Sequence, residues 1–275
     1  MSVSNPTPGL HLLPRMAALA ATLLASVHGA LTVASLNCTF LISPSTAAQA
    51  GLDQSGDRYG AYDEKFDNLA KLILSSRTEF VGLETIGAKR EVEDLAVRLS
   101  GVSGDTWKGI FIPGASRLVG RNLAVVYRPR RGLQINRAGR ILDLAEVPNH
   151  VVFVLTADET EYSVCLVDLT DPGGPDPATN TAQLQALRIW SQRQAGTAVI
   201  MGTFNEARRK LLPLFSINER LGWPATELEN QGRDYIFSSK ALAMGEIIVP
   251  PYGANPGMAL RTRWTDHFLV KALIP

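Results

Sequence analysis

Several short apolar runs in the sequence end in polar or ionisable residues, and these ends are where the chain could do chemistry. Amide and carboxylate oxygens are ligands for hard divalent cations, and a phosphoryl group needs positioning and charge neutralisation. One such end is ordinary, because strands often finish where the chain turns to solvent. Together they point to one metal or phosphate site. The residues concerned are Asn37, Glu84, Asp168, Thr203 with Asn205, and Asp266 with His267.

The elements that must position these residues begin as an alternation of strands and helices. Residues 31–36 and 79–84 are apolar runs typical of buried strands. Residues 62–76 and 90–99 carry apolar side chains at helical spacing, so each predicted helix has a stripe that must pack on a sheet. Residues 43–60 are small and polar, which predicts a loop.

After residue 107 the pattern changes to short strands separated by glycine, proline or charged turns. A helix is expected at residues 181–194 and a helical turn or two at 206–212, while the proline-rich stretch 171–177 predicts a loop beside Asp168. Many short strands with a few covering helices indicate a layered α/β architecture. The expected strands cover residues 107–112, 122–127, 151–155, 162–167, 199–202, 234–239 and 268–274.

Taken in chain order, these motifs resemble those of the endonuclease/exonuclease/phosphatase superfamily, which includes DNase I. The family's first strand ends in Asn and a later one in Glu, matched by Asn37 and Glu84. Its Asp-Tyr strand is matched at residues 234–235, and its closing Ser-Asp-His at 265–267, with Thr in place of Ser. Two catalytic positions depart from the pattern. Asp168 stands where the family carries His, and Thr203 stands where its Gly-Asp-Phe-Asn motif carries Asp.

The resemblance implies a fold, a cofactor and a set of roles. The fold would be a four-layer α-β-β-α sandwich, two mainly antiparallel sheets flanked by helices, formed by residues 31–275 as a single domain. The cofactor would be Mg²⁺ (or Mn²⁺ or Ca²⁺), held by Glu84 with Asn37 and Asp266 nearby. The remaining roles would be phosphate contact for His267, support of the catalytic histidines for Asp234, and positioning of phosphate or nucleophile for Asn205.

The two departures put the activity in question. The Thr203 hydroxyl can hold a water molecule but cannot accept its proton at neutral pH, so base assistance worth roughly 10²- to 10⁴-fold is expected to be missing. Asp168 would repel a phosphate unless it were protonated or metal-bound. Together with Glu84 and Asp266 it could instead complete a cation site of three carboxylates. His150, beside a strand, is interpreted as an ordinary strand-edge residue, so no second catalytic histidine is expected.

Two functions remain open. The first is a divalent-metal-dependent phosphoesterase, a nuclease or other phosphodiesterase, with a modified active site. The second is a catalytically lapsed member of the family that binds a phosphorylated ligand, a nucleic acid or a protein without hydrolysis. We favour the hydrolase, because the retained polar residues have little reason to occur together in a pure binding module. The expected partner is a phosphoester substrate, nucleic acid included, and the expected state is a monomer.

Composition narrows these options. With 45% hydrophobic residues and a net charge of +1, the chain of 275 residues has ample core material and no charge excess. The near-neutral balance argues against tight, nonspecific DNA binding. Basic runs at 128–131 and 208–210 are typical of solvated surface but could contact phosphates. Cys38 and Cys165 lie in apolar runs and are expected to be small core residues.

The first 30 residues differ from the rest of the chain. Arg15 precedes an uncharged stretch, 16–27, and small residues follow it. This is the layout of a secretory signal peptide, and the stretch is too short for a stable membrane span. An N-terminal helix packed on the domain is the alternative. A secreted or periplasmic location and a cytoplasmic one both stay open.

Overall fold

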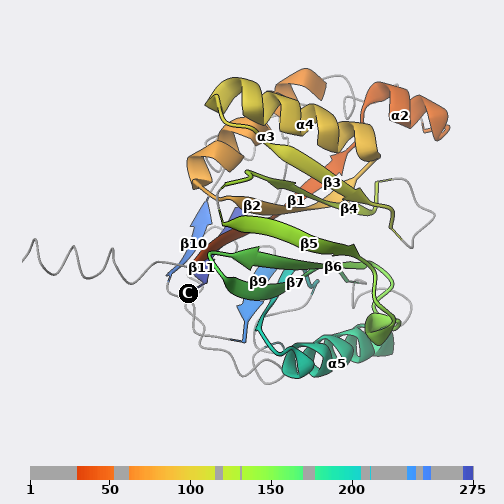
Figure 1. Ribbon diagram of the computed structural model, residues 1–275. Coiled ribbons are helices and arrows are strands. Elements are labelled where there is room, and N and C mark those ends of the chain that lie inside the picture. The colour runs from red at the N-terminus through yellow and green to blue at the C-terminus, as the bar shows by residue number, and fades with distance from the viewer. Residues whose placement is uncertain are drawn as a thin grey trace, which may run out of the picture.

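The protein is built from two β-sheets packed face to face, with helices on the outer faces (Figure 1). The computed structural model describes residues 30–52, 62–114, 120–130, 132–169, 177–205, 211, 234–239, 244–248 and 269–274. Among these residues, seven of the nine strand pairings are antiparallel. The four-layer, mainly antiparallel sandwich expected from the sequence is therefore confirmed.

The first sheet has six described strands in the order β10-β11-β1-β2-β4-β3. Its central strands β1 and β2 run parallel, because the chain between them crosses over through helix α3 (Tyr62–Ser76). Helix α4 (Lys89–Ser103) follows β2, and both helices bury apolar stripes on the outer face of this sheet. The strands are β1 (Leu31–Leu41), β2 (Phe80–Ile86), β3 (Lys108–Ile112), β4 (Asn122–Tyr127), β10 (Met244–Ile248) and β11 (Leu269–Ile274).

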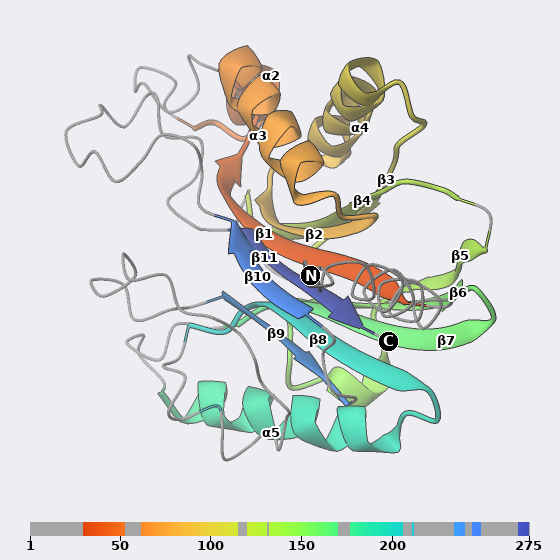
Figure 2. The same ribbon diagram turned by 90° about the vertical axis from the view of Figure 1, so that its left-hand side faces the viewer.

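The second sheet has five described strands in the order β5-β6-β7-β8-β9. Helix α5 (Pro177–Arg193) joins the parallel strands β7 and β8 and packs Leu184, Leu187 and Trp190 against the outer face of the sheet. Figure 2 shows α3 and α4 over one sheet and α5 beneath the other. The strands are β5 (Leu133–Gly139), β6 (His150–Ala157), β7 (Thr160–Asp168), β8 (Thr197–Thr203) and β9 (Asp234–Ser238), and a 3₁₀ turn, η1 (Leu142–Leu144), precedes β6.

The core between the sheets is formed by alternate residues of each strand. Leu31 and Val33 of β1 point inward, as do Leu166 of β7 and Met201 of β8. Gly82 of β2 lies where these side chains meet, since a Cβ atom there would lie 2.6 Å from Leu166 Cδ1 and 2.7 Å from Met201 Cε. Because strand side chains alternate between faces, the next inward positions along β1 and β2 fall on polar residues.

The structure differs from the sequence-based expectation in three elements. The loop expected at 43–60 contains a short helix, α2 (Pro44–Gln49), whose start is capped by the Ser43 side chain accepting from the Thr46 amide at 3.1 Å. Strand β5 was not expected, because the alternation of apolar and polar residues in it stops after Leu133 and Ile135. Strand β10 was not expected either, although its residues pair with β11.

Most other expectations within the described residues are confirmed. The helix expected at 62–76 is α3, and Cys38 and Cys165 are buried free thiols. Strand β1 continues to Leu41, so Asn37 lies within the strand and not at its end. The leader-like segment 1–30 lies outside the described residues apart from Ala30, as does the turn expected at 206–212 apart from Leu211. No helix in the described part of the chain is both long enough and apolar enough to cross a membrane.

Candidate active site

Polar residues replace apolar ones on the inward faces at one end of the inter-sheet core. On the first sheet, Asn37 of β1 is paired with Glu84 of β2. On the second sheet, Thr203 of β8 is paired with Asp168 of β7 on one side and Asp234 of β9 on the other. Paired residues of neighbouring strands project from the same face. Each sheet therefore presents one polar row, and the two rows face each other across the sandwich.

The Thr203 hydroxyl joins the two rows. It lies 2.7 Å from Asp234 Oδ1 on its own sheet, and it accepts a hydrogen bond from Asn37 Nδ2 at 3.0 Å on the facing sheet. The distance from Thr203 Oγ1 to Glu84 Oε2 is 3.4 Å. The hydroxyl is almost completely buried, while Asp234 is partly exposed. Four of the expected site residues are thus in mutual contact through one oxygen atom.

Glu84 is a fully buried carboxylate held by the neighbouring strand β1 of its own sheet. Ser35 of β1, also fully buried, donates to Glu84 Oε1 at 2.7 Å. The pairing of β2 with β4 shifts register between Leu83 and Ile86, which is a β-bulge at the position of Glu84. The residue after it, Thr85, has a φ of 60°, a left-handed conformation that is rare and strained for a β-branched side chain. The backbone is therefore distorted where Glu84 is presented.

Asp168 is fixed at the other end of its row. Asn149, just before β6, donates from Nδ2 to Asp168 Oδ2 at 3.1 Å, and the Asp168 amide donates to the Asn149 carbonyl at 3.1 Å. Asn205 lies two residues beyond β8 with a φ of 54°, and its Nδ2 donates to the Leu169 carbonyl at 2.7 Å. Asp168 and Asn205 both lie near Thr203, where strands β7 and β8 end.

The glycine and the aromatic residue around Thr203 have structural roles. Gly202 has a φ of 133°, and a Cβ atom there would lie 1.9 Å from the Val167 carbonyl oxygen, so β8 can approach β7 only with glycine at this position. Phe204 is buried against Tyr235 and Phe237 on the α5 side, with ring centroids 5.8 Å and 5.1 Å away. Anchoring of Phe204 in that core fixes the polar residues on either side of it.

The structure thus brings together most of the expected site residues. Asn37, Glu84, Thr203 and Asp234 are in contact, and Asp168 extends their row. Asp266 and His267 lie outside the described residues, so their expected roles remain predictions. The cation site of three carboxylates likewise remains a hypothesis, since it includes Asp266.

The described donor atoms suit a hard cation. Glu84 and Asn37 offer carboxylate and amide oxygens side by side on neighbouring strands, which is the chemistry that Mg²⁺, Mn²⁺ or Ca²⁺ prefers. Cys38 projects to the opposite face, and burial, reinforced by the Glu84 carboxylate, raises the pKa of its thiol, so it stays neutral. Within the described ranges, no group of three or more His, Cys, Asp or Glu residues could hold a metal ion.

Three contributors to the site were not expected from the sequence: Ser35, Thr85 and Asn149. Ser35 could have been found, because it lies two residues before Asn37 and a period of two places both on one face of a strand. Thr85 donates to Asn37 Oδ1 at 2.8 Å, but only through a left-handed backbone that no local pattern predicts for threonine. Asn149 reaches Asp168 through the pairing of β6 with β7, which is a long-range contact.

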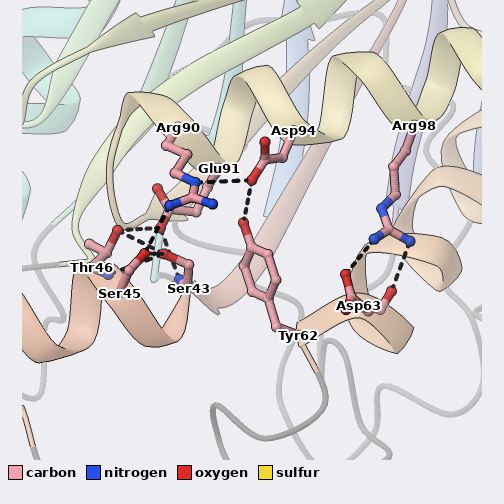
Figure 3. A network of polar contacts seen from close by, with 9 residues as sticks. All are labelled: Ser43, Ser45, Thr46, Tyr62, Asp63, Arg90, Glu91, Asp94 and Arg98. Carbon is pink, nitrogen blue, oxygen red and sulfur yellow. Dashed lines mark hydrogen bonds and ion pairs between the residues drawn. The ribbon is translucent and has the colours of Figure 1, made fainter.

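A polar network ties down the segments that follow the two site strands (Figure 3). Glu91, buried in the first turn of α4, accepts from the Ser43 amide at 2.9 Å and from Thr46 Oγ1 at 2.6 Å. The chain beyond β1 is therefore bound to the helix that follows β2. Nearby, Tyr62 of α3 donates to Asp94 of α4 at 3.2 Å, which holds the two covering helices together.

The described part of the basic run, residues 128–130, lies away from the site. It follows Tyr127, which pairs with Phe80 at the opposite end of β2 from Glu84. Arg128 contacts Asp105 at 2.8 Å, and Arg130 contacts Glu79 at 2.7 Å and Asp158 at 2.8 Å. These cations already have carboxylate partners, which favours the solvated-surface interpretation over phosphate binding.

His150 is more than a strand-edge residue. It is buried at the start of β6, where its Nε2 accepts from the Ile141 amide at 3.1 Å. Nδ1 must then carry the proton, and it donates to the Val147 carbonyl. Burial lowers the pKa of His150, so the ring is neutral and braces the η1 turn. These contacts give His150 a structural role at the start of β6.

Comparison with known proteins gives matches of structure only. No family model and no curated protein sequence matches the chain. A humanized TDP2 from D. rerio superimposes with a TM-score of 0.59 at 15% identity, covering 90% of this chain and 99% of that one. For an endonuclease/exonuclease/phosphatase family protein from Leptotrichia buccalis, the TM-score is 0.58 at 12% identity, with coverages of 89% and 99%.

A third solved structure resembles this chain to a similar degree. The mannosyl-6-phosphatase of Bacteroides thetaiotaomicron superimposes with a TM-score of 0.58 at 14% identity, covering 89% of this chain and 100% of that one. The three matches cover 89–90% of this chain and 99–100% of the other chains, at sequence identities of only 12–15%. The fold that the motif resemblance implies is thereby confirmed: this chain has the fold of the endonuclease/exonuclease/phosphatase proteins.

Proposed function

We propose that the protein is a divalent-metal-dependent phosphoester hydrolase, acting as a nuclease or on another phosphodiester. The observation that carries the proposal is the buried Glu84 carboxylate, oriented by Ser35 and placed at a strained bulge opposite a row of polar side chains. Burial of a carboxylate is costly unless something offsets the cost. Strained backbone conformations cluster at functional sites. The burial occurs at Glu84 and the strain at the next residue, Thr85, and Glu84 is the residue to which the resemblance assigns the metal.

The residues divide into binding and activating groups. Glu84 and Asn37 would hold Mg²⁺, Mn²⁺ or Ca²⁺, with Asp266 as the further expected ligand, and a bound cation would neutralise charge on the phosphoryl group. Asn205 and His267 are proposed to position the phosphate. Thr203 would hold the attacking water. Fold alone does not determine substrate, so nucleic acid and smaller phosphodiesters are both included.

The test is hydrolysis of bis(p-nitrophenyl) phosphate and of plasmid DNA by the purified chain with and without Mn²⁺ or Mg²⁺. Glu84→Gln removes the carboxylate charge at nearly constant shape and is expected to abolish metal-dependent turnover. Glu146→Gln makes the same chemical change at an exposed position and should leave the rate unchanged. Equal turnover by Glu84→Gln and Glu146→Gln would refute the assignment of Glu84.

A lapsed site that binds a phosphorylated ligand without hydrolysis is the second candidate, because Thr203 supplies no carboxylate where the family places one. The same assay separates the two functions. Thr203→Asp is expected to raise the rate of an active wild type. Absence of turnover by the wild type, with turnover gained in Thr203→Asp, would establish the lapsed site.

A further inference from the structure

The hydrogen bonds of the Thr203 hydroxyl have a direction. A hydroxyl has one proton to donate and two lone pairs with which to accept. Asn37 Nδ2 is a donor, so Thr203 Oγ1 accepts from it. The proton of Thr203 then points to Asp234 Oδ1 at 2.7 Å in preference to Glu84 Oε2 at 3.4 Å. One lone pair of the hydroxyl remains for a further donor.

Asp234 is the carboxylate best placed to take that proton. It is directly paired with Thr203 across β8 and β9, so the contact is fixed by the strand register. The distance of 2.7 Å is typical of a strong hydroxyl-to-carboxylate bond. Asp168, on the other side of Thr203, receives its described hydrogen bond from Asn149 instead. Asp234 is partly exposed, so a proton received there has access to solvent.

We propose that Thr203 and Asp234 act together as a two-step base, in which Thr203 relays a proton from the attacking water to Asp234. The inference rests on the proposed hydrolysis. It names Asp234 as the base, because position 203 carries Thr and not the Asp of the family motif. Asp234 would be the terminal acceptor, in place of the histidine-supporting role that the resemblance implies. The carboxylate thus stands one strand away from its position in the family.

The proton transfers balance as follows in a single hydrolytic step. The water oxygen forms a new bond to phosphorus, and the bond from phosphorus to the leaving oxygen breaks with its electron pair. One O–H bond of the water breaks, and its proton passes to Thr203 Oγ1. The original Thr203 O–H bond breaks, and that proton passes to Asp234 Oδ1. Asp234 later loses the proton to solvent, and the leaving alkoxide takes a proton from solvent.

The test compares variants of the full chain hydrolysing bis(p-nitrophenyl) phosphate with Mn²⁺. Thr203→Ser keeps a hydroxyl and should stay within about threefold of the wild type. Thr203→Val removes the relay, and Asp234→Asn removes the acceptor charge while keeping an oxygen that accepts from Thr203. Each should lose roughly 10²- to 10⁴-fold in kcat. Asp143→Asn, on the exposed η1 turn, is the matched control and should be unaffected.

Two readouts distinguish a relay from a structural contact. Steps in series are not additive, so the double variant Thr203→Val/Asp234→Asn should lose no more than either single variant. When the hydrolysis rate is measured in mixtures of H₂O and D₂O, its plot against the deuterium fraction should be curved, because two protons move in the same step. Full activity of Thr203→Val, additive losses, or a linear isotope dependence in the wild type would overturn the relay while hydrolysis stands. A wild type without turnover would overturn both.

Discussion

Removal of the Ser35 hydroxyl should destabilise the protein through Glu84. The hydroxyl donates at 2.7 Å to a carboxylate that is fully buried, and Ser35→Ala deletes this donor without changing the strand. Hydrogen bonds to charged groups contribute about 1.5–3 kcal/mol, so we expect the free energy of unfolding to fall by about 2 kcal/mol. In a domain of this size, that corresponds to a melting temperature lower by roughly 4–8 °C.

Urea denaturation followed by circular dichroism measures this loss. Ser163→Ala is the matched control: Ser163 is a buried strand serine with no side-chain hydrogen bond to another described residue, and its replacement should cost less than about 1 kcal/mol. Combining Ser35→Ala with Glu84→Gln sharpens the result. A neutral amide gains only about 0.5–1.5 kcal/mol from the same donor, so the Ser35 substitution should cost less in that background. Equal losses for Ser35→Ala and Ser163→Ala would refute the argument.

Two further predictions concern the scaffold. Gly82→Ala should destabilise by about 1–3 kcal/mol in urea titrations, because its Cβ would lie 2.6 Å from Leu166 Cδ1 and 2.7 Å from Met201 Cε, whereas Gly101→Ala in α4 meets nothing within 4 Å and should stabilise. His150 is neutral in the folded state, and burial lowers its pKa below the unfolded value of about 6.5. Its contribution to stability is therefore complete above pH 6.5 and lost as the pH falls, so the deficit of His150→Phe relative to the wild type should shrink between pH 7.5 and 5, and a constant deficit would contradict this.

The sequence predicts site residues where a polar or ionisable residue lies at or near the end of an apolar run that forms a strand. Glu84 and Thr203 end or nearly end apolar runs, and the alternation of side chains between the two faces of a strand places them on the same face as Gly82 and Met201. Asn37 was expected at a strand end and lies inside β1, because the pairing of β1 with β2 continues to Leu41. The predicted end of the strand was wrong, but the face of the strand on which Asn37 lies is unchanged, so Asn37 still reaches the site.

What the sequence could not predict depends on contacts between distant segments. The Ser35 hydroxyl meets Glu84 across 49 positions, and the Thr203 hydroxyl meets Glu84 across 119. The left-handed Thr85 contradicts the preference of its own residue type, and only the surrounding bulge enforces it. Packing of the two sheets overrides local preference at this point, which is also where the proposed metal ligand is presented.

The contacts of Thr203 lead to a different interpretation of this residue from the one that the sequence suggests. In the sequence, Thr203 stands where the family motif has Asp, so the motif lacks a carboxylate at this position. In the structure it lies 2.7 Å from Asp234 and 3.4 Å from Glu84, so an aspartate there would place a third negative charge within contact distance of two others. Such charges repel strongly at these distances unless a cation neutralises them. The hydroxyl avoids this repulsion, and its hydrogen bond to Asp234 is the path that the proposed relay uses. In the proposed relay, the two tasks that the resemblance gives to one aspartate, holding the water and accepting its proton, would thus fall to Thr203 and Asp234 on neighbouring strands.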